Sequence, residues 1–218
     1  MPDQTETPVY SYWDHRTVVG ILGVSLPFVL LLGGLIFGPH GLQDSISSYY
    51  YTRMRDVFVG TLWAIGFFML AYRGYERSDD IAGDLACLFA VLVSLFPTAP
   101  APPFSNEARY IGYAHLVFAA LYFLTLTYFC LFLFTKTDPS QPPTPGKLVR
   151  NRIYRACGYV MLFCILLMGV DAFLPGGGDS PTSLFHPLFW LETASILAFG
   201  VAWFAKGRDI QNIFPALR

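Results

Sequence analysis

The sequence predicts an all-α integral membrane protein, a bundle of six transmembrane helices with both termini in the cytoplasm. Of its 218 residues, 54% are hydrophobic and only 13% are charged, and the mean hydropathy is +0.47. Soluble domains usually carry about 25% charged residues. The apolar residues fall into six runs, and Lys and Arg are unequally divided between the connections. A net charge of −1 argues against a nucleic-acid partner, because phosphate binding needs a basic excess.

The six runs predict a single transmembrane domain over residues 17–205, with a cytoplasmic segment 1–16 before it and a cytoplasmic tail 206–218 after it. About 20 helical residues cross a hydrocarbon core of about 30 Å. The predicted spans are approximately 17–37, 53–73, 81–96, 110–135, 156–174 and 187–205. Glycines within the spans, Gly23 and Gly34 among them, predict close helix approach. The proline-rich stretch KTDPSQPPTPGK predicts an extended linker between the fourth and fifth spans.

The distribution of basic residues predicts the orientation. Of the 14 Lys and Arg residues, Arg53, Arg55 and Arg109 lie in the first, third and fifth connections, and the other 11 lie in the termini and the remaining connections. Cytoplasmic loops carry the excess of positive charge in membrane proteins. The chain is therefore expected in a cell inner membrane, with both termini in the cytoplasm and the first connection on the outer side.

The first connection contains a polar stretch, Asp44–Asp56, with the sequence DSISSYYYTRMRD. Serine and tyrosine hydroxyls can donate and accept hydrogen bonds, and the arginines can serve as counter-charges. Three consecutive tyrosines are most often part of an interfacial aromatic belt. The stretch is nevertheless expected to cover a binding site, with candidate residues Asp44, Ser48, Tyr49, Arg53, Arg55 and Asp56.

Further ionisable residues are expected at the same depth as the end of this stretch. Counting along the helices from the outer side places Asp56, His115, Asp171, His186 and Glu192 in one outer layer. An acidic residue in a span costs a few kcal/mol, so each is expected to face the bundle interior and find a partner. The layer predicts an outward-facing polar pocket, although a single histidine such as His115 is more often a packed, hydrogen-bonded residue than a ligand.

The pocket is compatible with several functions. We expect it to bind a lipid headgroup or another amphiphile, or to be covered by a partner subunit or a second copy of the chain in an accessory role. One alternative is a metal-dependent membrane hydrolase in which His115 and His186, with Asp171 or Glu192, hold zinc. A lower alternative is a b-type haem protein with two facing histidines. No cofactor is favoured by a motif.

A resemblance concerns residues 44–98. The stretch DSISSYYYTRMRDVFVG and the later RGYERSDDIAGDLACLFAVLVSLFPT resemble a pattern of uncharacterised bacterial six-span membrane proteins, a group broadly similar to the DRAM/Sfk-like proteins. The remaining spans match that group in number and spacing. The resemblance implies six helices, a bacterial inner-membrane setting and a role in lipid organisation.

Overall fold

A computed structural model describes residues 12–38, 41–72, 76–100, 105–137, 142–173 and 185–206. Within these ranges every regular element is helical. The predicted cytoplasmic segment 1–16 lies outside them except for residues 12–16, which form the start of the first helix. Of the predicted tail 206–218, only Lys206 is described.

The chain forms six long helices and two short ones. Their bounds are α1 (Tyr12–Phe37), the 3₁₀ helix η1 (Ser47–Tyr51), α2 (Arg55–Leu70), α3 (Arg77–Leu95), α4 (Asn106–Tyr128), the π-helix η2 (Phe129–Leu133), α5 (Pro145–Phe173) and α6 (Pro187–Lys206). The prediction of an all-α chain is therefore confirmed. Each predicted span overlaps one of the long helices.

Four of the six long helices are long and apolar enough to cross a membrane. These segments are Thr17–Phe37, Asn106–Leu133, Pro145–Ala172 and Pro187–Lys206. The other two, α2 and α3, are shorter, with 16 and 19 residues. Acidic residues in the first half of α3 lower its hydropathy, because Asp79, Asp80 and Asp84 all lie within two turns of its start.

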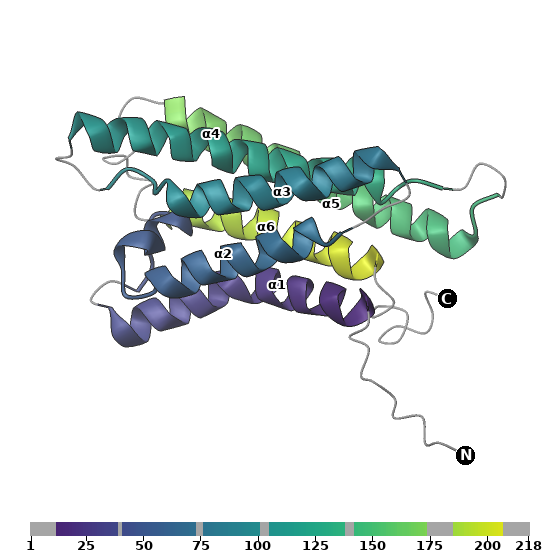
Figure 1. Cartoon of the computed structure of the whole chain (residues 1–218), viewed down its shortest axis with the longest axis horizontal. Helices are drawn as coiled ribbons and strands as arrows, with labels where there is room; N and C mark the ends of the chain where they lie inside the picture. The colour runs from purple at the N-terminus through teal and green to yellow at the C-terminus, as the bar shows by residue number, and fades with distance from the viewer. Residues whose placement is uncertain are drawn as a thin grey trace, which may run out of the picture.

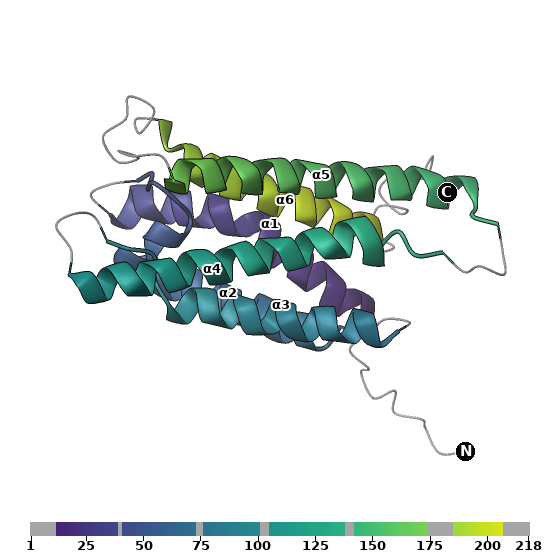
Figure 2. The same cartoon turned by 90° about the horizontal axis from the view of Figure 1, so that it is seen from above.

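The six long helices close into a ring. Each packs against the next in chain order, and α6 packs back against α1 (Figures 1 and 2). Successive helices run in opposite directions, so α1 begins and α6 ends at the same end of the bundle, which we call the terminal end. The short helix η1 lies at the opposite end, which we call the η1 end.

Aromatic side chains fill the ring at the terminal end. The ring of Tyr72 lies edge-on to Phe129 at 5.2 Å between centroids, and Phe134 lies 5.9 Å from Trp203, which is itself 5.6 Å from Phe199. Such pairs add about 0.5–1.5 kcal/mol each beyond burial. The π-helix η2 supports this packing: its wider turn, closed by the Phe134 N–H bonding to the Phe129 carbonyl at 2.8 Å, lets both rings face the interior.

A charged cluster at the terminal end joins α3 to the end of η2. The Lys136 ammonium donates to Glu76 at 2.9 Å and to both carboxylate oxygens of the buried Asp79 at 3.1 Å. Glu76 and Asp79 also form a reciprocal capping box at the start of α3. Burial alone lowers the pKa of Lys136, but the hydrogen bonds and negative charges of Glu76 and Asp79 outweigh it, so the pKa is raised. Lys136 therefore stays protonated and holds the two helices together.

The fifth helix begins earlier than the sequence predicts. The predicted span starts near residue 156, whereas α5 starts at Pro145, within the stretch expected to be an extended linker. Thr144 is the N-terminal cap, since its hydroxyl and carbonyl accept from the N–H groups of Lys147 and Leu148. Proline is favoured directly after such a cap. The helix extends beyond the predicted span because hydropathy marks only the apolar part of a helix, and the first turns of α5 are basic; the last three residues of the predicted linker, 145–147, are therefore helical.

A close approach is found at Gly34, where the neighbour is the connection after α1 and not another long helix, and none is found at Gly23. A side-chain methyl at Gly34 would lie 2.5 Å from the Gly41 carbonyl oxygen and 3.0 Å from the Tyr49 ring. Nothing lies within 4 Å of the equivalent position at Gly23. Gly34 therefore lets the chain after α1 fold back against the helix and place η1 in the mouth of the ring.

Replacing Gly34 with Ala is expected to lower the free energy of unfolding by about 1–3 kcal/mol, because the added methyl group overpacks the contact with Gly41 and Tyr49. The control is Gly23→Ala, for which we expect no loss and a gain of up to about 1 kcal/mol from helix propensity. Thermal unfolding of the two purified variants in detergent measures the difference. Equal melting temperatures would contradict the close approach at Gly34.

Candidate functional site

The polar stretch after α1 folds into the mouth of the ring instead of lying on its surface. Ser45 begins a tight turn in which its hydroxyl accepts the Ser48 N–H at 3.0 Å and bonds the Ser48 hydroxyl at 2.8 Å. The turn leads into η1. Ile46 is 3% exposed, Ser47 6% and Tyr49 0%. We call residues 44–51 the plug, because they close the η1 end of the ring.

Each of the three consecutive tyrosines has a different partner. Tyr49 is fully buried and donates its hydroxyl to the Gly41 carbonyl at 2.7 Å; burial raises its pKa, so the hydroxyl remains a donor. Tyr50 accepts from Arg55 at 2.6 Å, with the guanidinium 4.2 Å above its own ring. Tyr51 donates to the Thr98 carbonyl after α3 at 2.7 Å. The tyrosines thus fix the plug to three surrounding segments.

The plug is also tied to the start of α6. The Asp44 carbonyl accepts the Phe189 N–H at 3.0 Å, and the Asp44 carboxylate lies 2.8 Å from the Nδ1 atom of His186. His186 has a φ of 45°. A left-handed conformation costs an L-residue about 1–2 kcal/mol, and the contact with Asp44 helps to hold it. This strained residue turns the chain into α6 directly beneath the plug.

Glu192 forms the deepest of these contacts. Its Oε2 atom accepts the Ile46 N–H at 2.5 Å, and Ser47 lies next to it in the lining of the cavity. Less than two helical turns separate it from His186, so the plug is held at the rim by Asp44 and on the axis by Glu192. No Lys, Arg or His of the described residues bonds to this carboxylate.

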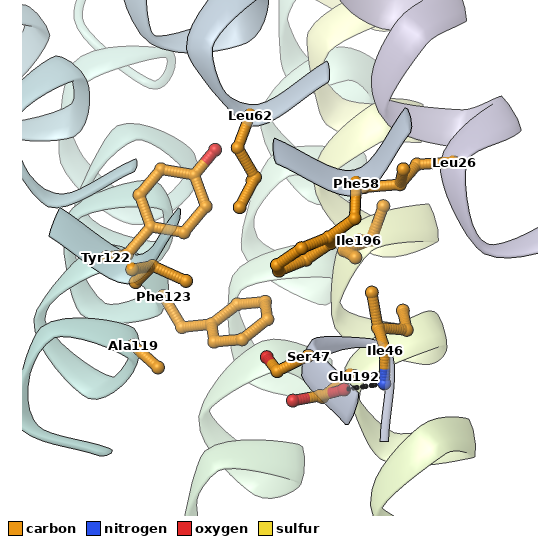
Figure 3. A pocket seen from close by; sticks show the side chains of 11 residues that line it. Leu26, Ile46, Ser47, Phe58, Leu62, Ala119, Tyr122, Phe123, Glu192 and Ile196 are labelled. Carbon is orange, nitrogen blue, oxygen red and sulfur yellow. Dashed lines mark hydrogen bonds between the residues drawn. The ribbon is translucent and has the colours of Figure 1, made fainter. Parts of the chain in front are cut away.

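A cavity of about 40 Å³ lies below the plug. Its walls are apolar and come from five of the six long helices, with Leu26 on α1, Phe58 on α2, Val93 on α3, Phe123 on α4 and Ile196 on α6. This volume holds up to about three water molecules or a small chemical group. Figure 3 shows the walls converging on the ring axis.

Polar groups stand at two ends of the cavity. Glu192 and Ser47 lie at the end next to the plug, and the Tyr122 hydroxyl lies at the opposite end, near Leu62 (Figure 3). The Tyr122 side chain is 7% exposed, and its hydroxyl makes no hydrogen bond with any described residue. The cavity can therefore accept both an apolar group and one polar group that bonds to oxygen.

The structure brings together some of the sequence-predicted residues and separates others. Asp44, Ser48, Tyr49, His186 and Glu192 all belong to the plug or to its contact with α6. The side chains of Arg53, Arg55 and Asp56 are exposed. Asp171 is half-buried near the end of α5, and no hydrogen bond or ion pair within the described ranges joins it to the other candidates.

His115 is at the expected end of α4 but does not reach the cavity. It is 3% exposed, and its Nδ1 atom lies 2.6 Å from the Phe96 carbonyl at the end of α3. A carbonyl only accepts, so Nδ1 carries the proton. His115 therefore ties α4 to an unpaired carbonyl of α3. This geometry fits the interpretation of His115 as a packed, hydrogen-bonded residue.

The proposed metal ligands do not form a ligand set. Among the described residues there is no group of three or more His, Cys, Asp or Glu side chains placed to hold a metal ion. His115 bonds to Phe96 and His186 to Asp44, so the two histidines proposed to hold haem have separate partners. The four cysteines are free thiols buried in the helices.

Sequence reasoning missed two residues of this end of the molecule. Ile46 supplies the backbone donor for Glu192, and Tyr122 lines the cavity. Tyr122 follows His115 by seven residues, two helical turns, and so lies deeper along α4. An uncharged hydroxyl among 13 tyrosines gave no signal of its own. The backbone donor of Ile46 cannot be read from a side-chain pattern.

Comparison with known proteins found no match to a family model, to a curated protein or to a solved structure. The resemblance of residues 44–98 to uncharacterised six-span proteins therefore stays a prediction. The candidate site is therefore argued from the positions of its residues alone.

Replacing Tyr49 with Phe is expected to lower the free energy of unfolding by about 0.5–1.5 kcal/mol, because the Gly41 carbonyl loses its buried donor. Tyr113→Phe is the matched control, since that side chain is 57% exposed and lies on the outer surface of α4. Thermal unfolding in detergent measures both. A loss of the same size in both variants would show that Tyr49 does not anchor the plug.

Proposed function

We propose that the chain is a multi-pass inner-membrane protein that binds an amphiphile in the cavity beneath the plug. In this proposal all six long helices cross the bilayer, both termini are cytoplasmic, and the η1 end faces outward. Membrane lipids are the immediate partners. The observation that carries the proposal is the cavity itself, which combines apolar walls with the half-buried carboxyl group of Glu192 at one end.

The exposed surfaces of α2 and α3 support their role as spans. Although both are short, large apolar side chains cover their outer faces: Val57, Phe67 and Leu70 on α2, and Ile81, Leu85, Leu88 and Leu95 on α3. Soluble monomers rarely expose apolar patches of more than a few hundred Å². Because α2 and α3 lie within the same ring as the four longer helices, one bilayer can cover all six outer faces.

The positions of the basic residues support the orientation. Arg53 and Arg55 stand at the η1 end, whereas Lys136, Lys147 and Arg152 stand at the terminal end. The sequence assigns 11 of the 14 basic residues to the termini and to the second and fourth connections, so the positive-inside rule directs those segments, and with them the terminal end, to the cytoplasm. The plug is then the first part of the ring that a ligand in the outer leaflet meets.

The geometry favours binding over catalysis. A binding site needs a cavity with a few convergent polar groups, and the cavity below the plug has Glu192, Ser47 and Tyr122. A hydrolase needs a metal or a nucleophile beside a base. Within the described ranges no group of three or more His, Cys, Asp or Glu side chains is placed to hold a metal. The arginines do not line the cavity, so the proposed site is smaller than the polar layer expected from the sequence.

Cysteine labelling in intact cells tests the orientation. In a background without the four native cysteines, Arg53→Cys is expected to react with a membrane-impermeant maleimide from outside. Arg152→Cys, also exposed and at the other end of the bundle, is expected to react only after permeabilisation. The reverse pattern would invert the topology, and reaction of both in intact cells would contradict the three spans, α2 to α4, that are proposed to separate the two positions.

Photolabelling tests the binding proposal. The protein in lipid nanodiscs is expected to react with a long-chain alcohol that carries a diazirine in its alkyl chain, with the label mapped to residues 112–128 of α4. Ala119→Leu, which fills the cavity, is expected to reduce labelling at least about tenfold. The matched control is Ala120→Leu, one residue along and exposed on the outer face. Labelling that is unchanged by Ala119→Leu, or reduced equally by both, would overturn the proposal.

A further inference from the structure

The Glu192 carboxyl group lies at the polar end of the cavity without a positive partner among the described residues. Its side chain is partly exposed, and the donor bonded to its Oε2 atom is the neutral Ile46 N–H. An ammonium group forms a stronger, charge-assisted hydrogen bond to a carboxylate than a neutral donor does. The polar end of the cavity therefore suits a cation.

Positive side chains are absent from the cavity. None of its lining residues is Lys, Arg or His among the residues that the structure describes. Arg53 is exposed, and Arg55 is held on the ring of Tyr50 at the surface. His186 faces Asp44 at the rim. An anionic headgroup in the cavity would meet the Glu192 carboxylate with nothing to neutralise it.

The size of the cavity restricts the cation. About 40 Å³ accommodates a group comparable to a few water molecules. A primary ammonium meets this limit and has three N–H donors, enough for Glu192 and the Ser47 hydroxyl with one to spare. A trimethylammonium group is larger and has no N–H donor. The apolar walls formed by Phe58, Phe123 and Ile196 suit the methylene groups next to the nitrogen.

We infer, building on the proposed binding function, that the group entering the cavity is a primary ammonium on an apolar chain. The ligand class is then an apolar amine, in which the nitrogen bonds to the Glu192 carboxylate and the chain contacts the aromatic wall. The arginines of the first connection, which would suit a phosphate group, take no part in this recognition.

Competition against the photolabel tests the inference with small water-soluble probes. Butylammonium is expected to suppress labelling of α4 at concentrations at least about tenfold lower than 1-butanol, butyl phosphate or butyltrimethylammonium. In Glu192→Gln this advantage is expected to disappear, because the amide oxygen still accepts the Ile46 N–H but the charge is gone. Glu107→Gln, an exposed residue in the first turn of α4, is the control and is expected to keep it.

The outcomes separate the two proposals. Butyl phosphate competing as well as butylammonium, or an ammonium advantage that survives in Glu192→Gln, would overturn the ammonium inference. Equal competition by all four probes, with labelling still sensitive to Ala119→Leu, would overturn it while leaving amphiphile binding in place. Labelling insensitive to Ala119→Leu would remove the proposed function itself. The order in which the four probes compete in the wild-type protein tests the inference by itself. The test therefore holds even if Glu192→Gln folds poorly.

Discussion

The bond between the Glu192 carboxylate and the Ile46 N–H joins the two parts of the molecule that lie farthest apart in sequence at the η1 end. It fixes the plug on the axis of the ring, and the contact of Asp44 with His186 and Phe189 fixes its edge. Without the plug, the mouth of the ring would expose the Glu192 carboxyl group and the aromatic wall below it. The cavity therefore exists only because a polar loop turns inward and is held there by an acid.

The two ends of the ring are closed in different ways. At the terminal end, aromatic rings such as Phe129 and Trp203 pack closely enough to fill the axis, and the ion cluster of Lys136 holds the helices from outside. At the η1 end, closure depends on hydrogen bonds to the backbone of a short 3₁₀ helix. Dispersion contacts also hold the plug, because the buried side chains of Ile46 and Tyr49 belong to the hydrophobic core. The η1 end is thus closed by polar and apolar contacts together.

Sequence reasoning recovered the helices and their order, because long apolar runs and their breakers mark them directly. It also placed His115, His186 and Glu192 at the same end, since depth along a helix follows from counting residues. It could not predict which neighbouring helix each side chain faces. Each residue turns a helix by about 100°, and six similar apolar runs do not reveal which neighbour each face meets. His115 consequently bonds to the end of α3, whereas Glu192 faces the axis of the ring. Of these two residues, Glu192 lines the cavity and His115 does not.

The plug shows the same limit at finer scale. Its composition indicated a site, yet the part that reaches the axis is Ile46 and Ser47, the least conspicuous residues of the stretch, while the charged Arg53 and Arg55 remain exposed. The physical reason is the cost of burial: an arginine cannot be neutralised by losing its proton, so it stays at the surface unless paired, whereas backbone N–H groups must be satisfied wherever they are buried. The half-buried Glu192 carboxyl group on α6 satisfies the Ile46 N–H. The acid and the loop backbone therefore meet each other's need for a hydrogen-bond partner, and in the proposed binding mode the same carboxyl group receives the ammonium of the ligand.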